Sequence, residues 1–191
     1  MQTSTSSPHR WYSIVMQQLP QFDPTKPFYP FIMTFYATVR GLIELSDKPT
    51  SDLAPLKLEA FTSQPLELDW KQLDTAFYKK TNTSIINLLE TALRSLIITC
   101  YETSVQHYQQ TDPEWRFFRF VRSAAAHDGR FYLQKRNGTF PVSNENPSAW
   151  STRQIHMFMD SDPLLIKDGD IEPFLKPGDV LQFLYDIEQK F

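Results

Sequence analysis

The sequence contains little cysteine and little glycine, and each shortage excludes a class of protein. Its 191 residues include one cysteine, Cys100, so no disulfide can form within the chain. Cys100 lies in an apolar run, and we expect it to be buried as a small hydrophobic side chain rather than to react. The five glycines are scattered, so the chain has no glycine-rich loop that could hold a nucleotide phosphate.

Long apolar runs and a strong charge of one sign are also missing. The longest apolar run without a charge, residues 27–39, is too short to span a bilayer. The first residues are polar and do not form a secretory signal. A formal net charge of −3 excludes a protein that coats nucleic acid through its overall charge, although a local basic patch is compatible with it. We therefore expect a cytoplasmic protein without membrane contact.

No set of metal ligands has a familiar spacing, and we expect neither a metal nor another cofactor. Histidine and cysteine do not cluster with the spacing of a zinc site. A calcium loop that began at Asp160 would need an oxygen ligand where Leu164 stands and a glutamate where Ile171 stands. We interpret this acidic segment as a solvated turn.

The composition that remains is typical of a globular protein with a core. Hydrophobic residues make up 41% of the chain and charged residues 21%, and the length suits one domain better than two. We expect a flexible N-terminus over residues 1–10 and a single helical domain over residues 11–191.

Hydrophobic periodicity and end signals predict a mainly α fold, an up-and-down bundle of four to five main helices. The expected helices cover residues 31–45, 69–80, 83–108, 112–127 and a closing segment that starts at Pro177. Residues 47–65 carry three prolines among polar residues, and we predict a connection there. A small β-hairpin insertion is expected before the last helix, with strands at 130–134 and 139–143 around Asn137-Gly138.

The helix predicted over residues 112–127 has two separate faces when it is drawn as a wheel. If Arg122 is placed at zero, one arc of the wheel is apolar and should face the core. It contains Phe117, Phe118, Phe120, Val121, Ala124 and Ala125. The other side, between about 60° and 140°, carries polar residues. They are Arg116, Arg119, Ser123 and His127. Trp115 and Ala126 are the only apolar residues on this side, and Ala126 leaves open space between Arg122 and His127.

Such a polar face suits the binding of a phosphodiester and, in one interpretation, its cleavage. Arginine has a planar, permanently charged fork of donors that matches a phosphate. Histidine can give and take a proton near neutral pH. RNA supplies its own nucleophile, the 2′-hydroxyl, so cleavage needs no metal, and two copies across a two-fold axis would supply both proton transfers. The structural alternative stays open, because a solvated helix face often carries arginine, and the helix dipole favours a histidine near the C-terminal end.

The segment from Arg122 to His127, RSAAAH, fits the Rx4–6H motif, and here the chain resembles the HEPN superfamily. The resemblance implies a helical bundle that forms homodimers, in which the motif arginine and histidine of both subunits line one cleft. Many such proteins are metal-independent endoribonucleases of toxin–antitoxin or phage-defence systems, so a cognate antitoxin or another partner protein is implied as well. By this resemblance Arg122 and His127 would be catalytic: His127 would be the acid/base, and Arg122 would bind and stabilise the phosphate.

Four further residues are predicted to bind RNA phosphates from their position on the wheel or their proximity to the motif. They are Arg116, Arg119, Ser123 and Arg130. The family usually has Asn, Asp or His directly after the motif arginine, whereas this chain has the shorter Ser123. This departure favours the alternative function, a catalytically inactive HEPN-like dimeric scaffold that binds a partner protein, RNA or a nucleotide.

Overall fold

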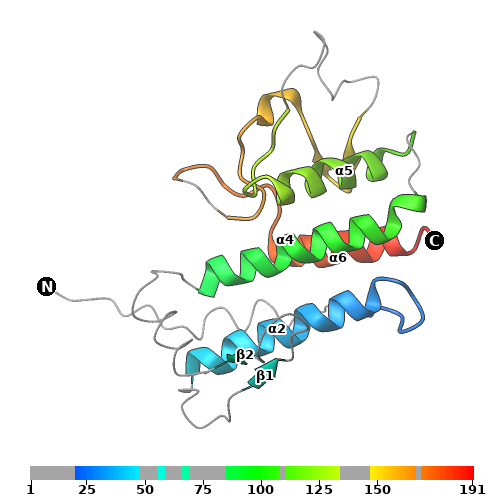
Figure 1. The fold of residues 1–191 in the computed structure, drawn as a ribbon. Coiled ribbons are helices and arrows are strands. Elements are labelled where there is room, and N and C mark those ends of the chain that lie inside the picture. Colours follow the sequence, from blue (N-terminus) through cyan, green and yellow to red (C-terminus); the bar gives the residue numbers. More distant parts are fainter. Residues whose placement is uncertain are drawn as a thin grey trace, which may run out of the picture. The chain divides into compact units, whose positions relative to one another are not determined.

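The computed structural model describes residues 20–47, 56–58, 66–68, 85–107, 111–133, 147–166 and 169–191 (Figure 1). The described part of the chain is mainly helical, as predicted, with four α-helices and a small antiparallel hairpin before the last of them. The helices are α2 (Tyr29–Asp47), α4 (Ile85–Ser104), α5 (Pro113–Ala126) and α6 (Pro177–Glu188). The predicted helix at 69–80 and the N-terminal residues 1–10 lie outside the described residues. None of the described helices is both long and apolar enough to cross a membrane.

The hairpin before the last helix lies at other residues than those predicted. Its strands are β3 (Ala149–Trp150) and β4 (Arg153–Gln154), which pair in antiparallel register. Of the predicted first strand, the described residues form one isolated bridge, Arg130 with Pro163. The apolar alternation there is real, because Phe131 is buried, but its backbone is bonded to residues 161 and 162 of a later loop. The predicted turn and second strand lie outside the described residues.

A second hairpin has its first strand within residues 47–65, which were predicted to be a connection. The strands β1 (Leu56–Leu58) and β2 (Leu66–Leu68) pair in antiparallel register, with Lys57 opposite Glu67. The prediction of a connection over residues 47–65 was therefore wrong for β1. Strands of three residues are too short for their alternation to stand out from the surrounding polar sequence.

The internal contacts of the chain divide it into two compact units. One unit contains the described residues up to Ile32 and from Leu93 onward, and it includes α5, α6 and most of α4. The other unit runs from Met33 to Ala92 and includes the rest of α2 and the β1–β2 hairpin. All the predicted site residues belong to the first unit.

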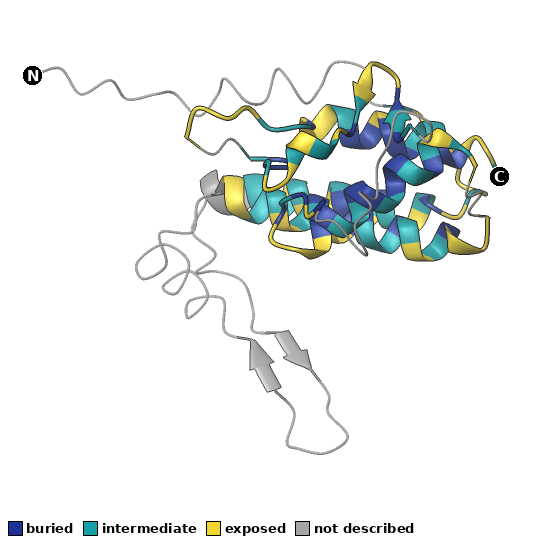
Figure 2. Ribbon diagram, turned by 90° about the horizontal axis from the view of Figure 1, so that it is seen from above, coloured by how far each residue is buried: buried dark blue, intermediate teal, exposed yellow. Residues whose placement is uncertain are grey.

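An aromatic core holds α5 and α6 together in the first unit. Phe183 of α6 packs edge-on against Phe117 and Phe118 of α5, with 5.1 Å between ring centroids in both pairs. Trp150 of β3 adds a third edge-on contact to Phe183 at 5.2 Å. Such aromatic pairs contribute through buried area and through the favourable edge-to-face geometry of the rings. Figure 2 shows that these helices have buried positions on one side and exposed positions on the other.

The apolar arc predicted for α5 is the buried side of the helix. All six of its predicted members are 8% exposed or less. The prediction for Trp115 was wrong, because the wheel placed it on the polar side and it is only 2% exposed. It lies parallel to Phe118 and Phe191, with ring centroids 6.1 and 5.8 Å away. The core therefore covers a wider sector of α5 than the wheel indicated.

Local signals set the two ends of α5 as predicted. At the start, the Asp112 side chain accepts hydrogen bonds from the backbone N–H groups of Glu114 and Trp115, and Pro113 occupies the first turn. At the end, His127 leaves the helical conformation, and Asp128 and Gly129 both adopt a positive φ, of 54° and 70°. Two successive left-handed residues stop the helix.

Cys100 is buried, as the sequence predicted. Its side chain is 0% exposed within α4, and burial raises the pKa of the thiol well above its usual range. The thiol is therefore neutral at physiological pH and contributes to the core as a hydrophobic group.

Candidate functional site

Three of the predicted site residues follow one another along the outer side of α5. Arg119 and Ser123 are partly exposed, and His127 is exposed. Their spacing of four residues places them about one turn apart, so that neighbouring side chains begin roughly 5–6 Å from each other. We call Arg119, Ser123 and His127 the α5 row. It presents a guanidinium, a hydroxyl and an imidazole in a line.

Arg119 contributes a positive charge that no carboxylate neutralises within the described residues. Its guanidinium carbon lies 5.1 Å from the centroid of the neighbouring Phe120 ring. This contact orients the side chain while its N–H donors stay available. Arg119 is therefore the member of the α5 row best suited to bind an anion.

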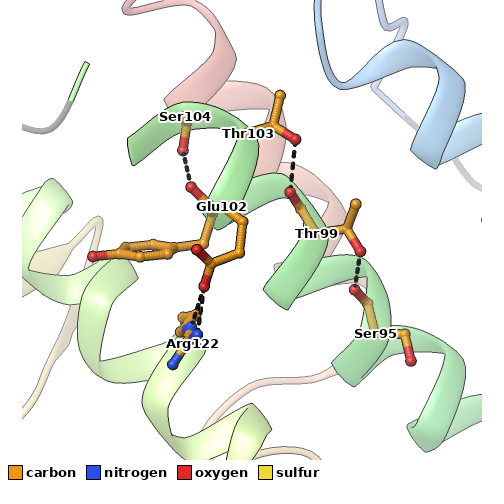
Figure 3. Close-up of polar contacts among 7 residues, drawn as sticks. Ser95, Thr99, Glu102, Thr103, Ser104 and Arg122 are labelled. Atoms are coloured by element: carbon orange, nitrogen blue, oxygen red, sulfur yellow. Dashed lines mark hydrogen bonds and ion pairs between the residues drawn. The ribbon is translucent and has the colours of Figure 1, made fainter. Parts of the chain in front are cut away.

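Arg122 faces in a different direction and is bound to α4. Its Nε donates a hydrogen bond of 2.9 Å to Oε1 of Glu102, and Nη2 of the same guanidinium also contacts that oxygen. Figure 3 shows Arg122 reaching from α5 to Glu102 on α4. The guanidinium carbon also lies 5.8 Å from the ring centroid of Tyr101. Arg122 stands two turns after the buried Trp115, so the two side chains lie on the same side of α5. That side faces neighbouring elements.

His127 caps the C-terminal end of α5 and has its own neighbour. Its backbone N–H donates to the carbonyl groups of Ser123 and Ala124, both at 3.1 Å. Its ring lies edge-on to Tyr132, with 5.6 Å between the ring centroids. In the described part of the chain, Arg122 and His127 therefore interact with different partners and not with each other. Their assignment as a catalytic pair stays a prediction.

Two other predicted phosphate-binding arginines donate to backbone carbonyl groups. Nε of Arg116 bonds the Pro147 carbonyl at 3.0 Å, and Nη1 of Arg130 bonds the Ser161 carbonyl at 2.8 Å. Each contact joins its arginine to a loop residue that stands 31 positions later in the chain. These contacts tie Arg116 and Arg130 to the loops around the site, whereas the α5 row faces outward.

Glu102 and Tyr132 are neighbours of the site that no sequence pattern predicted. Glu102 lies 20 residues before Arg122 and on another helix, so no local spacing connects them. Tyr132 has a weak signal, because it stands between the buried Phe131 and Leu133 and alternation would turn it outward.

Comparison of the chain with protein-family models, with curated proteins and with solved structures finds no match in any of the three. The fold and the site by themselves define a mainly α-helical protein that carries an outward-facing Arg–Ser–His row on α5. Among the residues that the structure describes, no three side chains of the histidine, cysteine, aspartate and glutamate types gather as metal ligands would. The row itself offers one guanidinium, one hydroxyl and one imidazole.

Proposed function

We propose that the protein is a HEPN-like, RNA-handling homodimer of the cytoplasm that binds single-stranded RNA through the α5 row. The observation that carries this proposal is the outward guanidinium of Arg119, which no carboxylate of the described residues neutralises, in line with the Ser123 hydroxyl and the exposed His127 ring. Arginine binds phosphate through a fork of N–H donors, and hydroxyl and imidazole groups add shorter-range hydrogen bonds. A net charge of −3 is compatible with this, since the row is a local site.

The contact between Arg122 and Glu102 favours binding without cleavage, the inactive scaffold of the two functions that the resemblance implies. A motif arginine that stabilises a phosphate must offer its donors to the phosphate oxygens. Here two donors of Arg122 are used by Glu102, and the carboxylate repels an incoming phosphate. Ser123 stands where the family usually has a longer polar residue after the motif arginine, and this too favours binding without cleavage. In this proposal a partner protein would use the dimer as a scaffold.

We expect Arg119→Gln to weaken RNA binding and to reduce its dependence on salt. Each phosphate contact on single-stranded nucleic acid contributes about 0.7 to the slope of log K against log salt concentration. The loss of one guanidinium should lower that slope by roughly this amount. Fluorescence anisotropy with a labelled single-stranded RNA, titrated at several salt concentrations, measures both quantities.

The matched control removes a positive charge outside the α5 row. Lys176 is exposed at the start of α6, and Lys176→Gln should leave the slope of the wild type unchanged. An equal loss of slope in both variants would indicate that overall charge, and not the row, attracts the RNA. A wild-type protein that is folded yet retains no RNA at low salt contradicts the proposed function.

The endoribonuclease remains the second candidate, because the ion pair that occupies Arg122 is partly open to solvent. The side chains of Arg122 and Glu102 are 35% and 51% exposed, and such pairs typically contribute about 0.2–1 kcal/mol. A substrate phosphate could therefore displace Glu102. Glu102→Gln should shift the melting temperature little and should bind RNA more tightly than the wild type, because a negative charge is removed.

Incubation with single-stranded RNA in EDTA separates the two candidates. We expect no cleavage by the wild type. Cleavage that disappears in both Arg122→Ala and His127→Ala would establish the endoribonuclease instead, with Glu102→Gln raising or preserving its rate.

A further inference from the structure

An apolar tip projects from the loop that follows β4. The short helix η4 (Met157–Met159) carries Phe158, which is 87% exposed, whereas Met157 and Met159 on either side are half-buried. A single exposed apolar side chain is common on a protein surface, so the neighbours of Phe158 decide whether it marks a binding surface.

The backbone that presents this tip is held in place by hydrogen bonds. The N–H of Met159 donates to the His156 carbonyl at 3.1 Å, and the N–H of Asp162 donates to the Met159 carbonyl at 3.0 Å. Ser161 adopts a left-handed φ of 72° and donates its N–H to the Phe131 carbonyl at 2.7 Å. A preorganised backbone loses little conformational entropy when the side chain that it presents binds a ligand, which favours a role in recognition.

The tip and the α5 row are connected through Tyr132. Residues 131–133 run beside residues 160–162, and Figure 1 shows η4 next to the chain that leaves the end of α5. Phe131 and Leu133 are each 1% exposed, so Tyr132 between them faces outward and is 50% exposed. Its ring lies 5.6 Å from that of His127. An exposed aromatic edge therefore continues from the end of the row toward Phe158.

The charges along this path differ from one end to the other. Arg119 at one end attracts phosphate, whereas Asp128 and Asp160 are exposed near the aromatic end. Asp160 also accepts a hydrogen bond of 2.7 Å from the N–H of Leu133, which fixes its carboxylate at the peptide group that follows Tyr132. These acids repel a phosphate but not an uncharged nucleobase. The aromatic end thus suits bases, and the arginine end suits the backbone.

We propose that Tyr132 and Phe158 stack on bases of single-stranded RNA whose phosphates contact Arg119. The inference rests on the proposed function and names the class of ligand, unpaired RNA with its bases turned outward. Base stacking on an aromatic side chain is typical of proteins that bind single strands without reading sequence. Loss of one such contact should weaken binding by about 5- to 150-fold.

The test compares an oligo(A) strand with an abasic strand of the same length and charge, both fluorescently labelled, on the full chain. The wild type should bind oligo(A) more tightly than the abasic strand. Phe158→Ala and Tyr132→Ala should remove most of this preference and keep the salt slope. Arg119→Gln should lower the salt slope and keep the preference. Val105→Ala, which truncates another half-exposed apolar side chain, should resemble the wild type.

Each other result overturns the inference in a distinguishable way. Equal binding of both strands, unchanged in Phe158→Ala, means that bases do not stack here, while the proposed RNA binding stands. Binding of neither strand by folded protein means that the proposed function itself is wrong. A self-association that sedimentation detects in the wild type and not in Phe158→Ala assigns the tip to a contact between two copies of the chain.

Discussion

Phe183→Ala should lower the free energy of unfolding by about 3–5 kcal/mol, the range measured for truncation of a buried aromatic side chain to alanine. Phe183 is 0% exposed and contacts the rings of Phe117, Phe118 and Trp150. Truncation removes all these contacts at once and leaves a cavity between α5, α6 and β3. Since small domains are stable by only about 5–15 kcal/mol, the variant should lose much of its stability.

Chemical denaturation followed by tryptophan fluorescence and circular dichroism measures this change. Phe158→Ala makes the same substitution at a phenylalanine that is 87% exposed, and it should change stability by no more than about 0.5 kcal/mol. If both variants lose the same stability, or if Phe183→Ala is as stable as the wild type, the aromatic core described between α5 and α6 is wrong.

The second large effect concerns Glu188, a buried carboxyl group near the end of α6. Its residue is 0% exposed, and Oε1 accepts a hydrogen bond of 2.7 Å from the Phe28 N–H. Oε2 has no hydrogen-bond partner within the described residues. Burial raises the pKa of Glu188, and the Phe28 N–H and the Lys26 ammonium group lower it by less. The Asp23 carboxylate also raises the pKa of Glu188.

The direction of the shift sets the direction of the pH dependence. Because the pKa of Glu188 is higher in the folded state than in the unfolded state, folding favours the neutral carboxyl group. The resulting stability is fully present below the pKa of the unfolded state, about 4.3, and is lost as the pH rises through the raised folded-state pKa. Glu188 therefore makes the protein less stable at neutral pH than at mildly acidic pH.

Glu188→Gln should remove this contribution, since the amide does not titrate and its oxygen can still accept from Phe28. The free energy of unfolding of the wild type minus that of the variant should be largest near pH 4 and should fall toward pH 8. Urea titrations at several pH values measure this difference. The subtraction removes the contributions that the other titrating groups make to both free energies of unfolding. Glu188→Ala should cost about 1–3 kcal/mol through the Phe28 N–H alone, because it leaves that donor buried without an acceptor.

Asp170→Asn is the matched control, because Asp170 is an exposed carboxylate in the same unit. Because the side chain is at the surface, the free energy of unfolding of Asp170→Asn should stay within about 0.5 kcal/mol of the wild-type value. A difference for Glu188→Gln that rises with pH would show that Glu188 is stabilised as the carboxylate, contrary to the structure.

Sequence patterns predicted α5 well because its signals are local. Asp112 and Pro113 at its start, and the left-handed Asp128 and Gly129 after its end, act within a few residues of the backbone groups that they satisfy. The apolar arc was recognised for the same reason, since helical periodicity places its members on one side regardless of their partners. The sequence therefore predicts that the residues of the α5 row share the outer side of the helix.

The misjudged residues are those whose environment comes from distant segments. Trp115 was assigned to the polar side, yet Phe191 and Phe118 cover it, and Phe191 stands 76 residues away along the chain (191 minus 115). The hairpin strand expected after α5 instead pairs its backbone with residues 161 and 162. A wheel describes angles around one axis and does not contain the neighbouring elements that fill the space around it.

By itself the sequence determined a mainly α-helical protein, the ends of α5, its buried side and the row of Arg119, Ser123 and His127. Capping and periodicity depend on interactions within a few turns, so they can be inferred from the order of the residues. Only the tertiary structure decided that Arg122 is bound to Glu102, that Tyr132 lies against His127 and that Phe158 faces water. Those contacts depend on how α4, α5 and the loop after β4 pack, and no spacing along the chain encodes that packing directly.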